Sequence, residues 1–229
     1  MRTPLVAVLA FANAFALPVP AAAQVAVADE GSFTITANGE RIGREEFRIR
    51  ATPGPANRPT FIASGTVVYD GRRLTPALST DTSLAPLGYE VEVRDGGSSE
   101  KLTGTFSRGR ISVRVRNPRG ESAREYVVNE GAYVLDDDVF HQYFFLARRE
   151  ASGAVPVVVP RRNVQVTMRV SWAGTEQVTI GGRSLAARRM VVEDPGTGRR
   201  EVLVDESGRV LRVSIPSKGI VATRDDPPR

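Results

Sequence analysis

Apolar and polar residues alternate with a period of two along most of this chain, between turns marked by glycine. The clearest run is 164–172, where Val, Val, Met, Val and Trp occupy every second position. Such alternation places the two kinds of side chain on opposite faces of a β-strand. Asn38-Gly39 suits a two-residue hairpin turn, because a type I′ turn needs positive φ at both central residues. Similar turn signals recur along the chain, so the sequence predicts a mainly β protein with a meandering antiparallel sheet.

The segment 136–149 departs from this period. Its apolar side chains recur at helical spacing, at positions 139, 140, 143, 144 and 147. Three aspartates precede them and Arg148-Arg149 follow, which suits helix capping and the helix dipole. We therefore predict one helix at about 138–149, packed on the concave side of a single strongly curved sheet, either a half-barrel or an open barrel. The run Phe144-Phe145-Leu146 leaves a buried strand as the alternative.

The strand pattern is the same before and after the segment 153–162, which contains Gly153 and two prolines. We therefore expect residues 24–229 to form a single β-rich domain rather than two. Residues 51–59 (ATPGPANRP) predict a proline-rich loop, because proline cannot continue a central strand. We predict that residues 217–229 form a flexible tail.

The first residues have the pattern of a secretion signal. Arg2 precedes an apolar stretch from Leu5 to Leu17, and small alanines at 21–23 suit cleavage near Ala23/Gln24, so residues 1–23 are the predicted signal peptide. The alternative is a membrane anchor, for which the apolar core is too short. The chain contains no cysteine, so neither disulfides nor a lipidated cysteine are expected. We predict a soluble periplasmic or secreted protein with no transmembrane segment in the mature chain.

Few residues could carry catalysis. His141 is the only histidine, whereas zinc sites need several His or Cys ligands, and no Gly-x-Ser-x-Gly motif surrounds any serine. Calcium binding by residues 136–138 is an alternative to helix capping, but the spacing lacks that of a calcium loop. A hydrolase would need carboxylates that the fold brings together; the candidates are Glu45, Glu90, Glu92 and Asp205. We expect a protein that is not an enzyme and binds no metal or cofactor.

Arginines are concentrated in residues 108–119 (RGRISVRVRNPR). The alternation places Arg110, Arg114 and Arg116 on one face of a strand. A row of like charges repels itself unless negative groups answer it. Carboxylates on a neighbouring strand are one possible source of the negative charge, and an anionic partner is the other. Nucleic acid is not an expected partner, because the chain is exported and no aromatic residues interleave with the arginines for base stacking.

Three segments resemble those of uncharacterised bacterial periplasmic proteins of unknown function. They are the turn Asn38–Gly43, the segment 137–148 (DDVFHQYFFLAR) and the late strand pair 204–216 (VDESGRVLRVSIP). The outline is similar to the curved antiparallel half-barrels of lipoprotein carriers, in which a sheet wraps an apolar cavity plugged by a helix. The resemblance implies a lipid or another hydrophobic ligand.

The first functional hypothesis is therefore a non-enzymatic carrier in the cell envelope whose curved sheet binds a hydrophobic small molecule or lipid. The residues expected to line its apolar pocket are Phe47, Tyr89, Phe106, Phe140, Phe144 and Trp172. Ordinary core packing would place the same residues together. The second hypothesis is an interaction or assembly protein that binds an envelope partner through a sheet edge or the arginine face at 108–119.

Overall fold

A computed structural model describes residues 26–53 and 59–229, which form one sheet of 15 strands. The predicted signal peptide 1–23 lies outside the described residues. The strands are β1 Ala26–Ala37, β2 Glu40–Pro53, β3 Pro59–Tyr69, β4 Arg72–Thr80, β5 Pro86–Asp95, β6 Ser98–Ser107, β7 Arg110–Asn117, β8 Gly120–Val127, β9 Tyr133–Val134, β10 Gly153–Val159, β11 Val164–Ile180, β12 Arg183–Asp194, β13 Gly198–Val204, β14 Val210–Ile215 and β15 Ile220–Arg224. The helical elements are α1 Tyr143–Arg148 and the 3-10 turns η2 Pro160–Arg162 and η3 Pro216–Lys218.

The sheet is an antiparallel meander with two exceptions to simple neighbour pairing. The first and last strands, β1 and β15, pair with each other in the middle of the sheet, with Phe33 opposite Arg224. The short β9 pairs with β10 in parallel. The strand order therefore runs from β8 through β1 to β15 and on to β9, which leaves β8 and β9 as the two edges.

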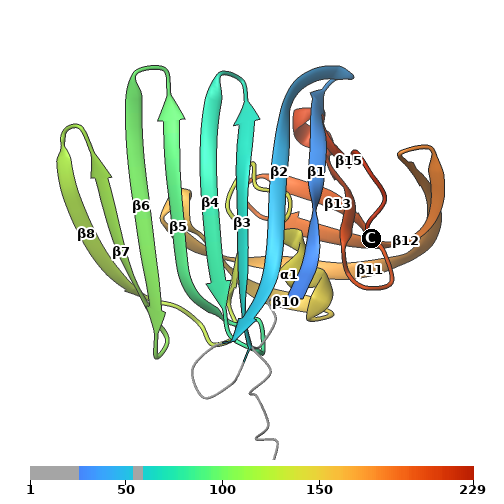
Figure 1. Cartoon of the computed structure of the whole chain (residues 1–229). Helices are drawn as coiled ribbons and strands as arrows, with labels where there is room; N and C mark the ends of the chain where they lie inside the picture. The colour runs from blue at the N-terminus through green and yellow to red at the C-terminus, as the bar shows by residue number, and fades with distance from the viewer. Residues whose placement is uncertain (1–25, 54–58) are drawn as a thin grey trace, which may run out of the picture.

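The sheet curves strongly and encloses its apolar face. In Figure 1, β1–β8 stand upright and β10–β13 run across behind them, with α1 in the space between. Irregularities in pairing bend several strands, as β-bulges do; the 17-residue β11 is interrupted between Trp172 and Thr175, where Gly174 has a φ of +85°. Side chains from both halves of the sheet share one buried cluster. The predicted fold class, a mainly β protein with one curved, open antiparallel sheet, is confirmed.

The one α-helix is present on the concave side, but the predicted bounds of 138–149 are wrong. The helix spans Tyr143–Arg148, and its N-cap residue is Gln142, which makes no capping bond with its side chain. Asp138 has a φ of +64°, which a helix does not allow. Before the helix, residues 137–138 and 141–142 form turns. The aspartates at 136–138 bind arginines instead of capping the helix.

Two other boundaries differ from the sequence prediction. Residues 217–229 are not a flexible tail, because Ile220–Arg224 form β15 between β1 and β14, with alternate side chains buried. The alternation there covers only five residues, and the prolines on either side hide it. The proline-rich loop is shorter than 51–59: β2 extends to Pro53 and β3 begins at Pro59, at the end of their ladder, where proline is tolerated.

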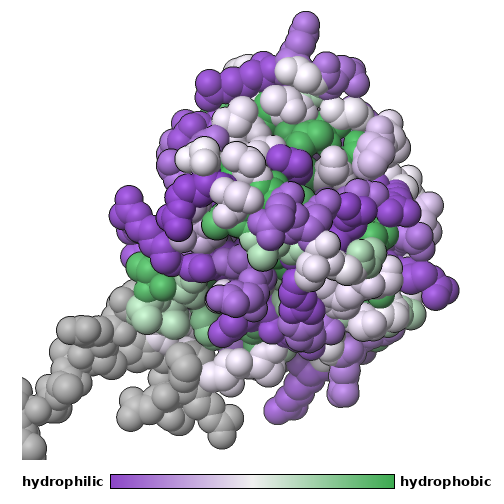
Figure 2. All heavy atoms as spheres, turned by 90° about the vertical axis from the view of Figure 1, so that its right-hand side faces the viewer, coloured by the Kyte–Doolittle hydropathy of each residue, from purple (hydrophilic) through white to green (hydrophobic). Residues whose placement is uncertain are grey.

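Of the helices within 26–53 and 59–229, none is both long and apolar enough to cross a bilayer. The side of the molecule shown in Figure 2 is mostly hydrophilic, and its apolar side chains form small, separate patches. Single exposed apolar residues of this kind are normal for protein surfaces.

Candidate functional site

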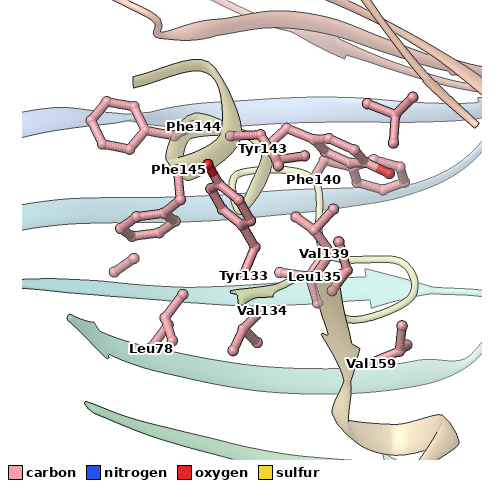
Figure 3. Packing of buried hydrophobic residues seen from close by; sticks show 14 of the residues in the cluster. Leu78, Tyr133, Val134, Leu135, Val139, Phe140, Tyr143, Phe144, Phe145 and Val159 are labelled. Atoms are coloured by element: carbon pink, nitrogen blue, oxygen red, sulfur yellow. The ribbon is translucent and has the colours of Figure 1, made fainter. Parts of the chain in front are cut away.

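The concave side of the sheet is filled by the chain itself. Most side chains between Ala132 and Ala147 are buried. Figure 3 shows labelled side chains of this segment gathered above Leu78 and Val159, in one apolar cluster. A hollow beside Asp136, Phe140 and Tyr143 has a volume of about 10 Å³, which is at the lower limit for one water molecule.

The residues predicted to line an apolar pocket are brought to this side of the sheet, but as packed core. Phe47, Tyr89, Phe140 and Phe144 are at most 6% exposed. Phe106 and Trp172 are half-buried at the periphery of the cluster. The Trp172 indole donates to the carbonyl of Ala151 at 3.1 Å, and the Arg188 guanidinium lies 4.1 Å above its ring. Binding of a hydrophobic ligand by these residues stays a prediction.

A buried carboxylate attaches this segment to the sheet. Glu45 of β2 is fully buried and accepts hydrogen bonds from the backbone N–H of Phe140 at 2.7 Å and of His141 at 3.3 Å. The His141 ring contacts the same carboxylate through Nδ1 and stacks on Phe47 at 5.5 Å. Gly65 leaves room for this ring, since a Cβ there would lie 3.2 Å from His141 Cε1. His141 is thus a core residue, and Glu45 is unavailable as a surface catalytic acid.

A second buried carboxylate fixes the start of the segment. Asp136 accepts hydrogen bonds from the Tyr89 hydroxyl at 2.7 Å and from Arg161 Nε at 2.9 Å. Burial, followed by the adjacent Asp136 carboxylate, raises the pKa of Tyr89 well above its ordinary value, so the phenol keeps its proton. The Gln142 amide oxygen accepts from the Asp136 N–H at 2.6 Å. These bonds hold the start of the segment in place, and the side chains of Tyr89 and Asp136 are buried.

The other carboxylates named as candidates do not form a pair with Glu45. Glu90 and Glu92 point outward from β5 and bind Lys101 and Arg94 respectively. Asp205 lies in the turn between β13 and β14 and binds Arg209 at 2.7 Å. Within the described ranges, no cluster of three or more His, Asp or Glu side chains is arranged to hold a metal ion.

Asp194 is the centre of an ion-pair cluster at the end of β12. Its side chain is fully buried and accepts from Arg162 at 2.7 Å, Arg200 at 3.1 Å and the Thr197 hydroxyl at 2.7 Å. Burial alone would raise the pKa of Asp194, but the hydrogen bonds from Thr197 and Arg162 outweigh it and lower the pKa far below its ordinary value of 3.8.

We expect Asp194→Asn to lower the free energy of unfolding by about 2 kcal/mol at neutral pH. Because the folded-state pKa lies below the unfolded value, the contribution is complete above pH 3.8 and is lost as the pH falls through the folded-state pKa. The difference between wild type and variant should therefore stay constant from pH 8 to pH 5 and narrow below pH 4 in urea titrations. The neighbouring, exposed Glu193→Gln is the control and should show no such difference; a pH-independent Asp194→Asn deficit would contradict the prediction.

The arginine face is present as predicted. Arg110, Arg114 and Arg116 point outward from β7, and carboxylates of β8 form ion pairs with them. Arg110 binds Glu125 at 2.9 Å, while Arg114 and Arg116 share Glu121 at 3.2 and 2.8 Å. The first of the two explanations for the row of arginines is therefore confirmed. The sharing of one carboxylate between two guanidiniums leaves the pair with excess positive charge.

The strands β6–β8 and their turns contain more basic than acidic side chains. Over residues 98–127, seven basic side chains stand against three acidic ones, in a chain of net charge +5. The basic residues are Lys101, Arg108, Arg110, Arg114, Arg116, Arg119 and Arg124, and the acidic ones are Glu100, Glu121 and Glu125. The strands β6–β8 therefore carry a net positive charge.

A hollow of about 340 Å³ lies on the outer face of β6 and β7. Its lining residues are Lys101, Thr103, Thr105, Ser112, Arg114 and Arg116. Each lining side chain can donate a hydrogen bond, and none is a carboxylate. Sequence reasoning found the two arginines but missed the other four residues, although the alternation of β6 places Lys101, Thr103 and Thr105 on its polar face.

Comparisons with known proteins bear on the fold alone. No protein-family model matches the chain, and no curated protein is significantly similar to it. A crystal structure of a β-barrel-like protein of the domain of unknown function DUF1849 from Brucella abortus covers 86% of this chain and 95% of its own, with 9% identity and a TM-score of 0.52. A DUF1089 family protein from Pseudomonas aeruginosa covers 73% and 87%, with 13% identity and a TM-score of 0.43.

The first likeness supports a β-barrel-like fold shared with a protein of unknown function. This agrees with the coarser part of the resemblance seen in the sequence. The similarity to lipoprotein carriers stays a prediction. The function must therefore be argued from the site itself.

Proposed function

We propose that the protein is an exported, non-enzymatic binding protein of the cell envelope that recognises an anionic partner through the outer face of β6 and β7. The observation that supports this proposal is the hollow of about 340 Å³ lined only by hydrogen-bond donors. Guanidinium groups bind phosphate and carboxylate with paired N–H donors, and arginine is always charged. Within the described residues, the chain's own core occupies the concave face.

The paired arginines keep donors available for a partner. Arg116 donates to Glu121 through Nε and Nη2, and Arg114 contacts it through Nε. A guanidinium has five N–H donors, so the remaining N–H groups can face an incoming anion. Glu121 thus orients the two side chains without neutralising both.

The test is binding to heparin, an acidic glycan, at 0.15 M salt, where screening suppresses long-range effects. We expect Arg114→Glu with Arg116→Glu to weaken binding about tenfold, because reversal places repulsive charge in the hollow. Arg48→Glu with Arg199→Glu changes the net charge equally at two other exposed ion pairs, and should alter binding less than about twofold.

Equal weakening by the two double variants would mean that only net charge matters, and absence of heparin binding by the wild type would overturn the proposal. Arg114→Gln with Arg116→Gln gives a milder change that avoids new like-charge pairs beside Glu121. Circular dichroism establishes that each variant is folded.

A further inference from the structure

The hollow on β6 and β7 has two chemically different ends. Its lining consists of three successive cross-strand pairs: Lys101 with Arg116, Thr103 with Arg114, and Thr105 with Ser112. Successive pairs on one face of a strand are about 7 Å apart, and paired residues are about 5 Å apart. The first pair is cationic, the second combines a cation with a hydroxyl, and the third has hydroxyls only.

Small residues on the flanking strands keep the hollow open. Gly88 of β5 is opposite Thr105, and Ala123 of β8 is opposite Arg114. A larger outward side chain at Gly88 would cover the hydroxyl end, and one at Ala123 would cover the middle pair. At the cationic end, Glu90 binds Lys101 at 2.7 Å and Glu121 binds both arginines, so the cations are held in place.

We infer that this hollow binds an anionic saccharide, with the acidic group between Lys101, Arg114 and Arg116 and the sugar hydroxyls on Thr103, Thr105 and Ser112. The inference rests on the proposed function and names the ligand of that site. Hydroxyl side chains both donate and accept, which matches a polyol. No aromatic ring lines the hollow, so the recognition relies on hydrogen bonds and charge rather than stacking. Its volume falls in the range of small-molecule sites.

The test is titration of the protein with glucose 6-phosphate, inorganic phosphate and glucose, followed by calorimetry or amide chemical shifts of β6 and β7. We expect glucose 6-phosphate to bind at least tenfold more tightly than either fragment. Equal affinity for inorganic phosphate would overturn the saccharide inference while leaving the proposed function standing. Absence of binding by all three ligands would overturn the inference of a sugar-specific site. Heparin binding that is lost in the Arg114/Arg116 variant would then support the proposed function through recognition of charge alone.

Thr105→Val with Ser112→Ala removes the hydroxyl end without changing charge. This variant should bind glucose 6-phosphate at least fivefold more weakly and inorganic phosphate unchanged. Thr179→Val with Ser184→Ala deletes another cross-strand Thr–Ser pair, on β11 and β12, and should leave both affinities unchanged. Unaltered sugar-phosphate binding in the Thr105/Ser112 variant would contradict the inference.

The same chemistry can come from a free sugar phosphate or from the headgroup of a glycolipid. Phosphatidylcholine vesicles containing lipid A, whose headgroup is a phosphorylated disaccharide, distinguish these sources. Co-sedimentation with these vesicles that glucose 6-phosphate competes away assigns the membrane-bound form. Binding of glucose 6-phosphate without co-sedimentation assigns the free form.

Discussion

Replacing Glu45 by alanine should lower the free energy of unfolding by about 4 kcal/mol, because it removes the acceptor for several buried donors at once. The Glu45 carboxylate is fully buried and accepts the N–H groups of Phe140 and His141 as well as the His141 ring. A methyl group at this position leaves all three donors without an acceptor and opens a cavity between β2 and the buried segment.

Urea denaturation measures this loss, and hydrogen exchange locates it. In Glu45→Ala, the exchange of the Phe140 and His141 amides should become much faster than in the wild type. The exchange of the β2 amides should change less. The control is Glu46→Ala, which removes an exposed side chain that contacts Arg44 at 3.2 Å; it should cost less than about 0.5 kcal/mol. A Glu45→Ala variant within about 1 kcal/mol of wild type would show that the attachment contributes little.

Replacing Arg224 by methionine should cost about 3 kcal/mol, because it leaves the Asp29 carboxylate buried without its partner. Arg224 is 3% exposed and donates to both Asp29 oxygens, at 3.0 and 2.8 Å. Its guanidinium also lies 5.3 Å above the Phe47 ring. This ion pair joins β1 to β15, the strands at the two ends of the sequence.

A double-mutant cycle separates the pair from the loss of one partner. Asp29→Leu combined with Arg224→Met should recover at least half of the lost stability, since two apolar side chains leave no unpaired charge. Burial already raises the pKa of Asp29 despite the nearby Arg224. Without the arginine the folded state takes up a proton at a still higher pH, so the deficit of Arg224→Met should be smaller at pH 5 than at pH 8.

The control for this cycle is Arg48→Met, which removes an exposed ion pair between Arg48 of β2 and Glu30 of β1. It should cost less than about 0.5 kcal/mol. If Arg224→Met alone is as stable as wild type, the buried pair does not hold the seam between β1 and β15 together. If the double variant is no better than the single one, packing loss rather than charge explains the effect.

Local alternation was enough to predict strands such as β5 and β7, which have one buried and one exposed face. It did not predict β15, whose alternation covers only five residues. The pairing of β1 with β15 could not be predicted, since it joins residues that are almost 200 positions apart. The helix was placed correctly but made too long, because aspartates before an apolar run have the same pattern whether they cap a helix or bind arginines from η2.

The site shows the same division. Arg110, Arg114 and Arg116 could be assigned to one face from the period of β7 alone. The hollow between them and Thr103 depends on the register of β6 against β7 and on the small residues Gly88 and Ala123 in the next strands. The alternation in β2 places Glu45 on the same face as Phe47 and Ile49, which indicates from the sequence that this carboxylate is buried. Its partner His141 could be identified only from the fold.

The pairing of β1 with β15 also determines the order in which parts of the sheet can fold. The ladder from β1 to β8 can form while synthesis continues, but its junction with the rest must wait until residues 220–224 exist. Contacts between such distant positions slow folding, and until they form, the edge of β1 is exposed to other chains. A chaperone that covers this edge, or transport of the unfolded chain across a membrane, would prevent premature aggregation.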